Sequence, residues 1–169
     1  VAGGAKFLAV VKANAYGHGA VPVAKAALEA GADMLAVAIP EEGIELRHAG
    51  ITAPILVLGG IEEAAAHDVV QSELTQVVFD EARIRALANA GQLLGKTAKV
   101  HLKLDTGMNR IGVRHDQVLE FMTQVGFHRA LDLGGVFTHF ATADANETLD
   151  FQIQAKHFIE AVSTLRSAG

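Results

Sequence analysis

The chain has 169 residues, 50% of them hydrophobic, a net charge of −5 and no cysteine. This length suits one domain with its own core, and the absence of cysteine excludes disulfides and thiolate metal sites. An acidic balance without a basic stripe argues against a nucleic-acid partner, and no apolar run reaches the roughly 18 residues of a membrane span. We therefore expect a cytoplasmic α/β protein that uses neither nucleic acid, nor a membrane, nor a metal ion.

Short apolar runs recur along the chain and predict its strands. Most are rich in Val, Ile, Leu or Phe, and several are apolar without alternation, as in strands that are buried on both faces. The predicted strands are Phe7–Val11, Met34–Ala38, Ile55–Leu58, Val77–Phe79, Val100–Leu104 and Leu133–Phe140.

Segments with helical spacing of apolar residues lie between these runs. The predicted helices are Val21–Ala30, Glu41–Ala49, Glu62–Val70, Asp80–Leu94, Asp116–Val125 and Leu149–Leu165. Glycine is favoured just after a helix because it adopts a positive φ without strain. We therefore expect Gly31, Gly50, Gly91 and Gly126 to end four of these helices.

The alternation of buried strands with helices predicts a parallel sheet, either doubly wound or closed as a (β/α)₈ TIM-type barrel. Polar residues fall at the C-terminal ends of several strands, namely Lys12, the segment 105–110 and His139, and barrel enzymes place their active sites at that end of the strands. This favours the barrel. A complete barrel needs about 250 residues. Residues 1–169 are therefore expected to form about six of the eight βα units in one partial barrel domain, without a C-terminal β domain.

A lysine closes the first apolar run, in the string VVKANAYGHG. Burying Lys12 beside an apolar strand is costly unless its amine has a use, and a desolvated amine can attack an aldehyde. On spacing alone, Lys12 could equally be a lysine whose stem lies on the rim of the barrel while its amine reaches water.

Two further strings carry polar residues at the C-terminal ends of predicted strands: HLKLDTGMNRIG, which contains Arg110, and GVFTHFATAD, which contains His139. A guanidinium binds carboxylate or phenolate oxygens well and stays charged. Taken alone, however, Arg110 could be a surface residue of a turn, and His139 a hydrogen-bonded structural histidine.

These three strings together resemble those of alanine racemases, along essentially the whole chain and in the family's order. The resemblance implies that Lys12 holds pyridoxal 5′-phosphate as a Schiff base and acts as one of two bases on the substrate α-carbon. Tyr16 would contact the cofactor phosphate, and His139 would lie against the cofactor ring. Arg110 would approach the cofactor's phenolic oxygen and the substrate carboxylate.

The resemblance implies further, weaker assignments. Met108 joins Arg110 at the substrate, and Asp144 corresponds to a position near the substrate entrance. Leu58 matches an apolar cofactor contact, although plain core packing explains it nearly as well. Lys103 matches a lysine that is carbamylated in some members, and an ion pair of Lys103 with Asp105 is the alternative.

The expected reaction is interconversion of L-alanine and D-alanine, which supplies D-alanine for peptidoglycan, by an enzyme that is a homodimer at full length. The second base, a tyrosine of a separate domain supplied by the partner subunit, has no counterpart in residues 1–169, so the isolated chain should racemise poorly. A non-catalytic pyridoxal-phosphate carrier with a related single barrel is the alternative. A decarboxylase of the same barrel type is a third possibility, which the string KLDTGMNRIG disfavours.

Overall fold

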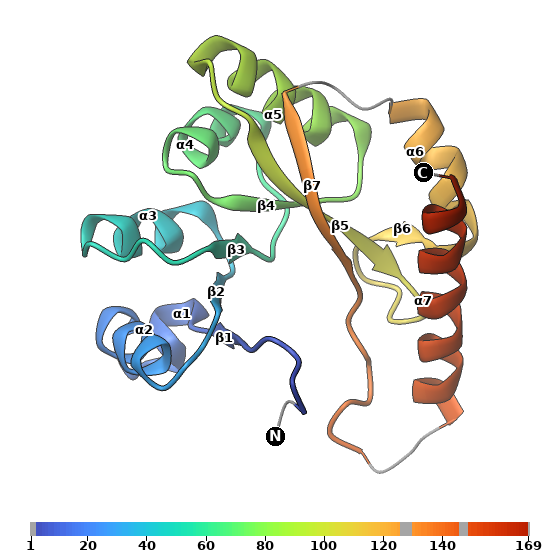
Figure 1. The fold of residues 1–169 in the computed structure, drawn as a ribbon, viewed down its shortest axis with the longest axis horizontal. Coiled ribbons are helices and arrows are strands. Elements are labelled where there is room, and N and C mark those ends of the chain that lie inside the picture. Colours follow the sequence, from blue (N-terminus) through green and yellow to red (C-terminus); the bar gives the residue numbers. More distant parts are fainter. Residues whose placement is uncertain (1–2, 126–129, 146–148, 169) are drawn as a thin grey trace.

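The computed structural model describes residues 3–125, 130–145 and 149–168, with only the backbone described at positions 124 and 125. It contains a parallel sheet wrapped by helices (Figure 1). The strands are β1 (Leu8–Val10), β2 (Met34–Val37), β3 (Ile55–Val57), β4 (Thr75–Val78), β5 (Ala98–Asp105), β6 (Val113–Arg114) and β7 (Leu131–Phe137).

Each strand but β5, which leads into β6, is followed by a helix that packs outside the sheet. The helices are α1 (Lys12–Tyr16), α2 (Ala20–Glu29), α3 (Pro40–His48), α4 (Ala66–Gln71), α5 (Glu81–Leu94), α6 (Val118–Val125) and α7 (Leu149–Ala168), with 3₁₀ turns η1 (Glu63–Ala65) and η2 (His115–Gln117). In Figure 1, α2 to α5 follow the left side and top of the strands, and α6 and α7 lie along the right.

The strands pair in the order β1-β2-β3-β4-β5, all parallel, and β7 pairs with the other edge of β5. The short strand β6 pairs with the last two residues of β5. Within the described residues β1 pairs only with β2 and β7 only with β5, so the barrel wall is open. The structure therefore confirms the six βα units expected for a portion of a TIM-type barrel.

Apolar side chains fill both faces of this sheet. The outer face packs on the helices through residues such as Leu35, Ile55 and Leu87, which are completely buried. Burying each such side chain contributes about 1.5–3 kcal/mol. The inner face carries a smaller cluster around Ala36, Leu56 and Val77. On this face Val10 stays 39% exposed, because the described chain does not close the barrel over it.

Some boundaries differ from the predicted ones. The last strand ends at Phe137, so His139 lies in the loop that follows and not within a strand. Gly31 and Gly50 have the predicted positive φ of 99° and 81°. The prediction for Gly91 was wrong: it is buried within α5, where an added Cβ would lie 2.8 Å from the Lys96 carbonyl, and Gly95 ends the helix instead. Gly126 lies outside the described residues.

No described helix is both long and apolar enough to cross a membrane.

Candidate active site at the carboxyl end of the strands

The side chains singled out from the sequence point to the inner face of the wall. Side chains alternate along a strand, so residues two apart share a face. Val10 pairs with Ala36, a member of the inner cluster. Lys12 follows just beyond the end of β1, and its positive charge lies near enough to His139 to lower the pKa of that imidazole. Leu58 and Phe137 pack against that same cluster.

Four basic side chains from three elements lie close enough to influence one another. Burial lowers the pKa of His139, and the positive charges of Arg110, Lys103 and Lys12 lower it further. His139 is therefore expected to be neutral at pH 7. A neutral imidazole among three cations forms a site suited to an anionic molecule.

Lys103 is the most buried of these groups, with 5% of its surface exposed. Burial is the main cause of its lowered pKa, the charge of Arg110 lowers it further, and Asp105 opposes the shift. Its Nζ lies 4.9 Å from the centre of the Phe137 ring, a cation–π contact. A buried cation beside an arginine is costly, so Lys103 is held there by the surrounding fold.

The loop that carries Arg110 is organised by Asp105 at the end of β5. One carboxylate oxygen of Asp105 accepts hydrogen bonds from the backbone N–H groups of Gly107 and Asn109, at 3.1 and 3.0 Å. Gly112 closes the loop at φ 138°, where an added Cβ would lie 2.6 Å from the Asp105 nitrogen. Asp105 thus serves the loop, and the described ion pairs do not include one between it and Lys103.

The loop after Lys12 has a conformation that the sequence does not predict. Ala13, Asn14, Ala15 and Tyr16 all have φ between 51° and 55°, so α1 is a left-handed turn made of non-glycine residues. Each such residue costs about 1–2 kcal/mol, and this kind of strain collects at functional sites. The turn leaves the Tyr16 side chain 61% exposed at the rim.

Glu42 holds this loop in place and was not predicted as a site residue. Its carboxylate accepts hydrogen bonds from the backbone N–H groups of Ala13 at 2.6 Å, Ala38 at 2.7 Å and Ile39 at 3.3 Å. It therefore joins the residue after Lys12 to the end of β2. The available signal was a glutamate at the third position of α3, the usual place of a capping carboxylate.

Comparison with known proteins identifies the family. The protein-family model for the alanine racemase N-terminal domain matches residues 1–169. The chain belongs to the alanine racemase family. It is 46% identical over 164 residues to alanine racemase of Symbiobacterium thermophilum, covering 97% of this chain and 44% of that protein. It is 43% identical to the Desulfovibrio desulfuricans enzyme, covering 98% and 45%.

Solved racemase structures share the fold. Alanine racemase from Clostridium difficile 630 superposes with a TM-score of 0.91 at 40% identity, covering 97% of this chain and 43% of that one. The Bacillus anthracis enzyme with bound L-Ala-P gives a TM-score of 0.88 at 43% identity, covering 97% and 42%. The chain thus spans somewhat less than half the length of these relatives.

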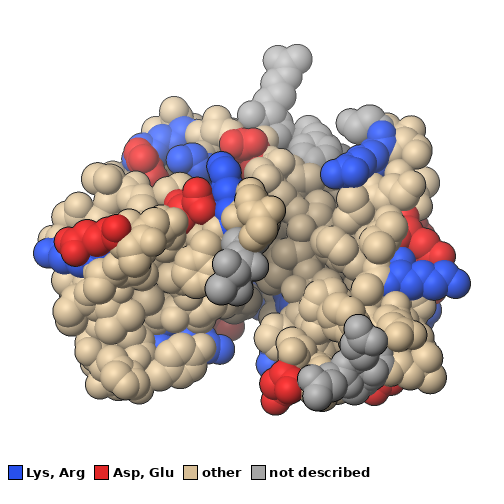
Figure 2. Space-filling view, turned by 60° about the horizontal axis from the view of Figure 1, so that its bottom comes forward, with Lys and Arg blue, Asp and Glu red and all other residues tan. Residues whose placement is uncertain are grey.

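The remaining residues assigned from the racemase resemblance lie around the same end. Leu58 is half-buried against the inner cluster. Met108 is half-buried in the Arg110 loop, and Asp144 is exposed in the turns after β7. Figure 2 turns the lower end of Figure 1 toward the reader and shows Lys and Arg side chains in separate groups among Asp and Glu side chains on a largely uncharged surface.

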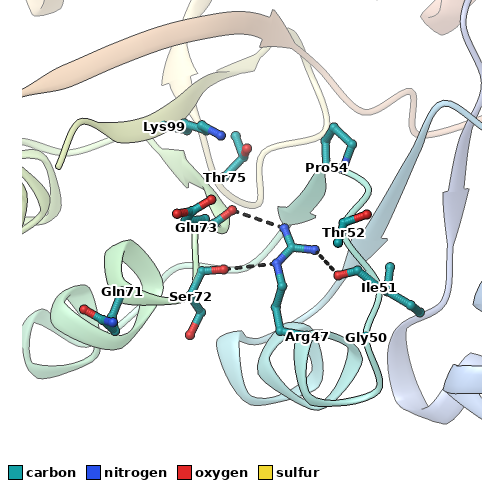
Figure 3. A pocket seen from close by; sticks show the side chains of 10 residues that line it. All are labelled: Arg47, Gly50, Ile51, Thr52, Pro54, Gln71, Ser72, Glu73, Thr75 and Lys99. Atoms are coloured by element: carbon teal, nitrogen blue, oxygen red, sulfur yellow. Dashed lines mark hydrogen bonds between the residues drawn. The ribbon is translucent and has the colours of Figure 1, made fainter.

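A pocket of about 400 Å³ opens at the other end of the strands from the basic side chains (Figure 3). Its wall includes Arg47, whose guanidinium donates to the backbone carbonyls of Ile51, Ala53, Ser72 and Glu73 at 2.8–3.2 Å. These bonds join the loop before β3 to the loop before β4. Arg47 is thus committed to the fold, and this pocket lies away from the basic group. The described residues include no group of three or more acidic or histidine side chains that could hold a metal.

Proposed function

We propose that this chain forms the cofactor-binding barrel portion of an alanine racemase that uses pyridoxal 5′-phosphate. The observation that carries the proposal is that Lys12, Lys103 and Arg110, which come from separate parts of the chain, all lie within electrostatic reach of His139. Family membership supports the reaction, interconversion of L- and D-alanine. The resemblance of the three strings supports the residue roles.

The residues fit the cofactor by charge and shape. Its phenolate and phosphate and the substrate carboxylate are anions, and the group formed by Lys12, Lys103 and Arg110 is cationic. Arg110 is exposed and makes none of the described ion pairs, so its five N–H donors are open to a carboxylate or phenolate. Lys12 is half-buried on the same face, with its loop anchored by Glu42.

Each side chain then has a distinct task. Bound pyridoxal phosphate supplies the electron sink that makes the substrate α-proton acidic. The Lys12 amine would hold the cofactor through its aldehyde, with loss of water, and once free would take or return the α-proton on one face of the substrate. Arg110 would bind the substrate carboxylate, with Met108 beside it. The Tyr16 hydroxyl would donate a hydrogen bond to the cofactor phosphate.

The two remaining cofactor contacts shape the ring site. His139 would present its imidazole to the cofactor ring, and Leu58 would line the ring site with an apolar side chain. Inversion of a stereocentre needs a base on the opposite face, and the resemblance assigns that role to a tyrosine beyond residues 1–169. Homodimer formation, a cytoplasmic location and D-alanine supply to peptidoglycan follow from the same resemblance.

Carbamylation of Lys103 is part of the proposal. Carbon dioxide would add to the neutral Nζ amine, so the ammonium group would lose one proton before the addition and a second as the carbamate forms. The buried cation would thus become an anion facing Arg110, and the repulsion that adds to burial in lowering the Lys103 pKa would be removed. After growth with ¹³C-labelled bicarbonate, a carbamate resonance should appear in the ¹³C spectrum and be absent from Lys103→Met.

The central test is covalent capture. The chain is incubated with pyridoxal phosphate, reduced with borohydride, digested and analysed by mass spectrometry. The adduct should lie on Lys12, disappear in Lys12→Ala and remain in Lys6→Ala, which removes an exposed lysine from the same end of the chain. An adduct that survives Lys12→Ala would refute the assignment.

A second measurement separates a racemase from a non-catalytic carrier. With L-alanine and D-alanine incubated separately in D₂O, a chain that supplies the Lys12 base alone should exchange the α-proton of one enantiomer and invert it slowly. A chain that captures the cofactor but exchanges no α-proton with either enantiomer would favour the carrier.

A further inference from the structure

Gln154 occupies a polar position in an otherwise amphipathic helix. It lies on α7 and is only 3% exposed, at the point where that helix crosses the carboxyl ends of β5 and β7. Its Nε2 donates to the Thr106 hydroxyl at 3.2 Å and to the His139 carbonyl at 3.0 Å. Its Oε1 accepts from the Ala141 backbone N–H at 2.9 Å. Both amide donors and the carbonyl oxygen are therefore used, and an amide is the side chain that offers this set.

The bond to Thr106 continues as a chain with one direction. The Thr138 hydroxyl donates to the Leu104 carbonyl at 3.0 Å and lies 2.8 Å from the Thr106 hydroxyl. Thr106 therefore donates to Thr138 and accepts from Gln154. Each hydroxyl donates one hydrogen bond and accepts one, so reversing a single donor would break this chain of hydrogen bonds. Thr106 is 1% exposed, where an unpaired hydroxyl would be costly.

The two loops joined by Gln154 carry the side chains assigned to the cofactor. Thr106 begins the loop that leads to Arg110, and the His139 carbonyl and Ala141 N–H belong to the loop after β7. Gly107, at φ 145°, lies so near that an added Cβ would be 3.2 Å from the Gln154 Cγ. His157, one turn further along α7, also bonds the Thr106 carbonyl through Nδ1 at 3.0 Å.

We propose that Gln154 is a positioning residue, which sets the spacing of the Arg110 and His139 loops from outside the barrel wall. Its effect on cofactor binding rests on the proposed function, whereas its effect on the loops does not. Lys12 is held separately by Glu42. The Lys12 loop and the two loops joined by Gln154 are therefore independent units of the site.

The experiment compares Gln154→Leu with Gln154→Glu and with Gln152→Leu, a matched control that makes the same change at an exposed position of α7. Hydrogen exchange is followed by mass spectrometry in peptides covering 105–112 and 138–142, with peptides from 34–78 as the internal reference. In the complete protein, Gln154→Leu should speed exchange in the two loops, leave 34–78 unchanged and weaken pyridoxal-phosphate affinity about tenfold. Borohydride capture on Lys12 should persist at saturating cofactor.

The variants give distinct outcomes. Gln154→Glu keeps an acceptor for Ala141 but no donor, so it should loosen the 105–112 peptide more than the 138–142 peptide. Exchange and affinity in Gln154→Leu equal to those of Gln152→Leu would overturn the proposal, and so would faster exchange spread evenly over 34–78. If the unsubstituted protein captures no cofactor on Lys12, the proposed function fails, while the exchange result still decides the role of Gln154.

Discussion

Replacing Glu42 by glutamine tests how the Lys12 loop is held. The carboxylate accepts three backbone hydrogen bonds, with Ala13 on one oxygen and Ala38 and Ile39 on the other. A glutamine amide has only one acceptor oxygen. If that oxygen keeps Ala38 and Ile39, its NH₂ group faces the N–H of Ala13, donor against donor.

The expected loss follows from these contacts. A hydrogen bond to a charged group contributes about 1.5–3 kcal/mol, and a donor left without a partner adds its desolvation penalty. Glu42 is partly exposed, which favours the lower end of the range, so the free energy of unfolding should fall by about 2 kcal/mol. For a domain of this size that corresponds to a melting temperature lower by about 4–8 °C.

Glu41→Gln is the matched control. Glu41 is exposed in the same first turn of α3, so the change removes the same charge near the helix N-terminus without the three hydrogen bonds. Loss of that charge alone costs about 0.3–1 kcal/mol. Thermal unfolding of both variants and the rate of cofactor capture at Lys12 are measured. If the two variants melt together and capture equally fast, Glu42 does not anchor the loop.

Four other predictions follow from the site and the fold. Arg47→Lys should lower the free energy of unfolding by about 1–3 kcal/mol, because an ammonium cannot reach the four carbonyls that the guanidinium joins. In the same denaturant titration, Arg85→Lys at an exposed position should change the free energy of unfolding little. Ala13→Gly should be more stable than Ala13→Val by at least about 1 kcal/mol because of the left-handed φ, and the reverse order would contradict the turn. Lys103→Met should raise the free energy of unfolding by about 1–2 kcal/mol in bicarbonate-free buffer. In bicarbonate the increase should be smaller if the amine is carbamylated. A lower free energy of unfolding in both buffers would show that Lys103 is well paired. His139 has a lowered pKa in the folded chain, so the unfolded chain binds more protons between that value and about 6.5, and stability should rise as the pH rises through this window. His139→Gln should flatten that rise in urea titrations, and an unchanged slope would argue against the lowered pKa.

Much of the repeating architecture could be read from local pattern. Apolar runs such as Met34–Ala38 and Ile55–Leu58 each contain an observed strand, because an uninterrupted apolar run suits a strand covered on both faces. Gly31 and Gly50 end their helices because a positive φ is costly for other residues. Gly91 misled the prediction, since a glycine is also needed where a helix packs closely on neighbouring carbonyls, as α5 does.

The basic residues of the candidate site were also visible in the sequence, because each lies at or near the C-terminal end of a predicted strand, in a string typical of the family. Their mutual arrangement was not. The predicted alternative of a Lys103–Asp105 ion pair looked reasonable from a spacing of two residues, yet Asp105 turns to the backbone of its own loop. Local spacing shows which side chains lie on the same face of a strand, but not which of several donors a carboxylate will bind.

The sequence by itself determined the alternation of the main strands and helices, because spacings of 2 and about 3.6 residues are local properties of the chain, and its resemblance to the racemases singled out Lys12, Arg110 and His139. Only the tertiary structure decided which hydrogen bonds hold the loops that carry these residues. Glu42 reaches Ala13 across 29 positions and Gln154 reaches Thr106 across 48. Such bonds form when strand register and helix packing bring distant segments together, and the left-handed turn after Lys12 persists because those contacts offset its strain.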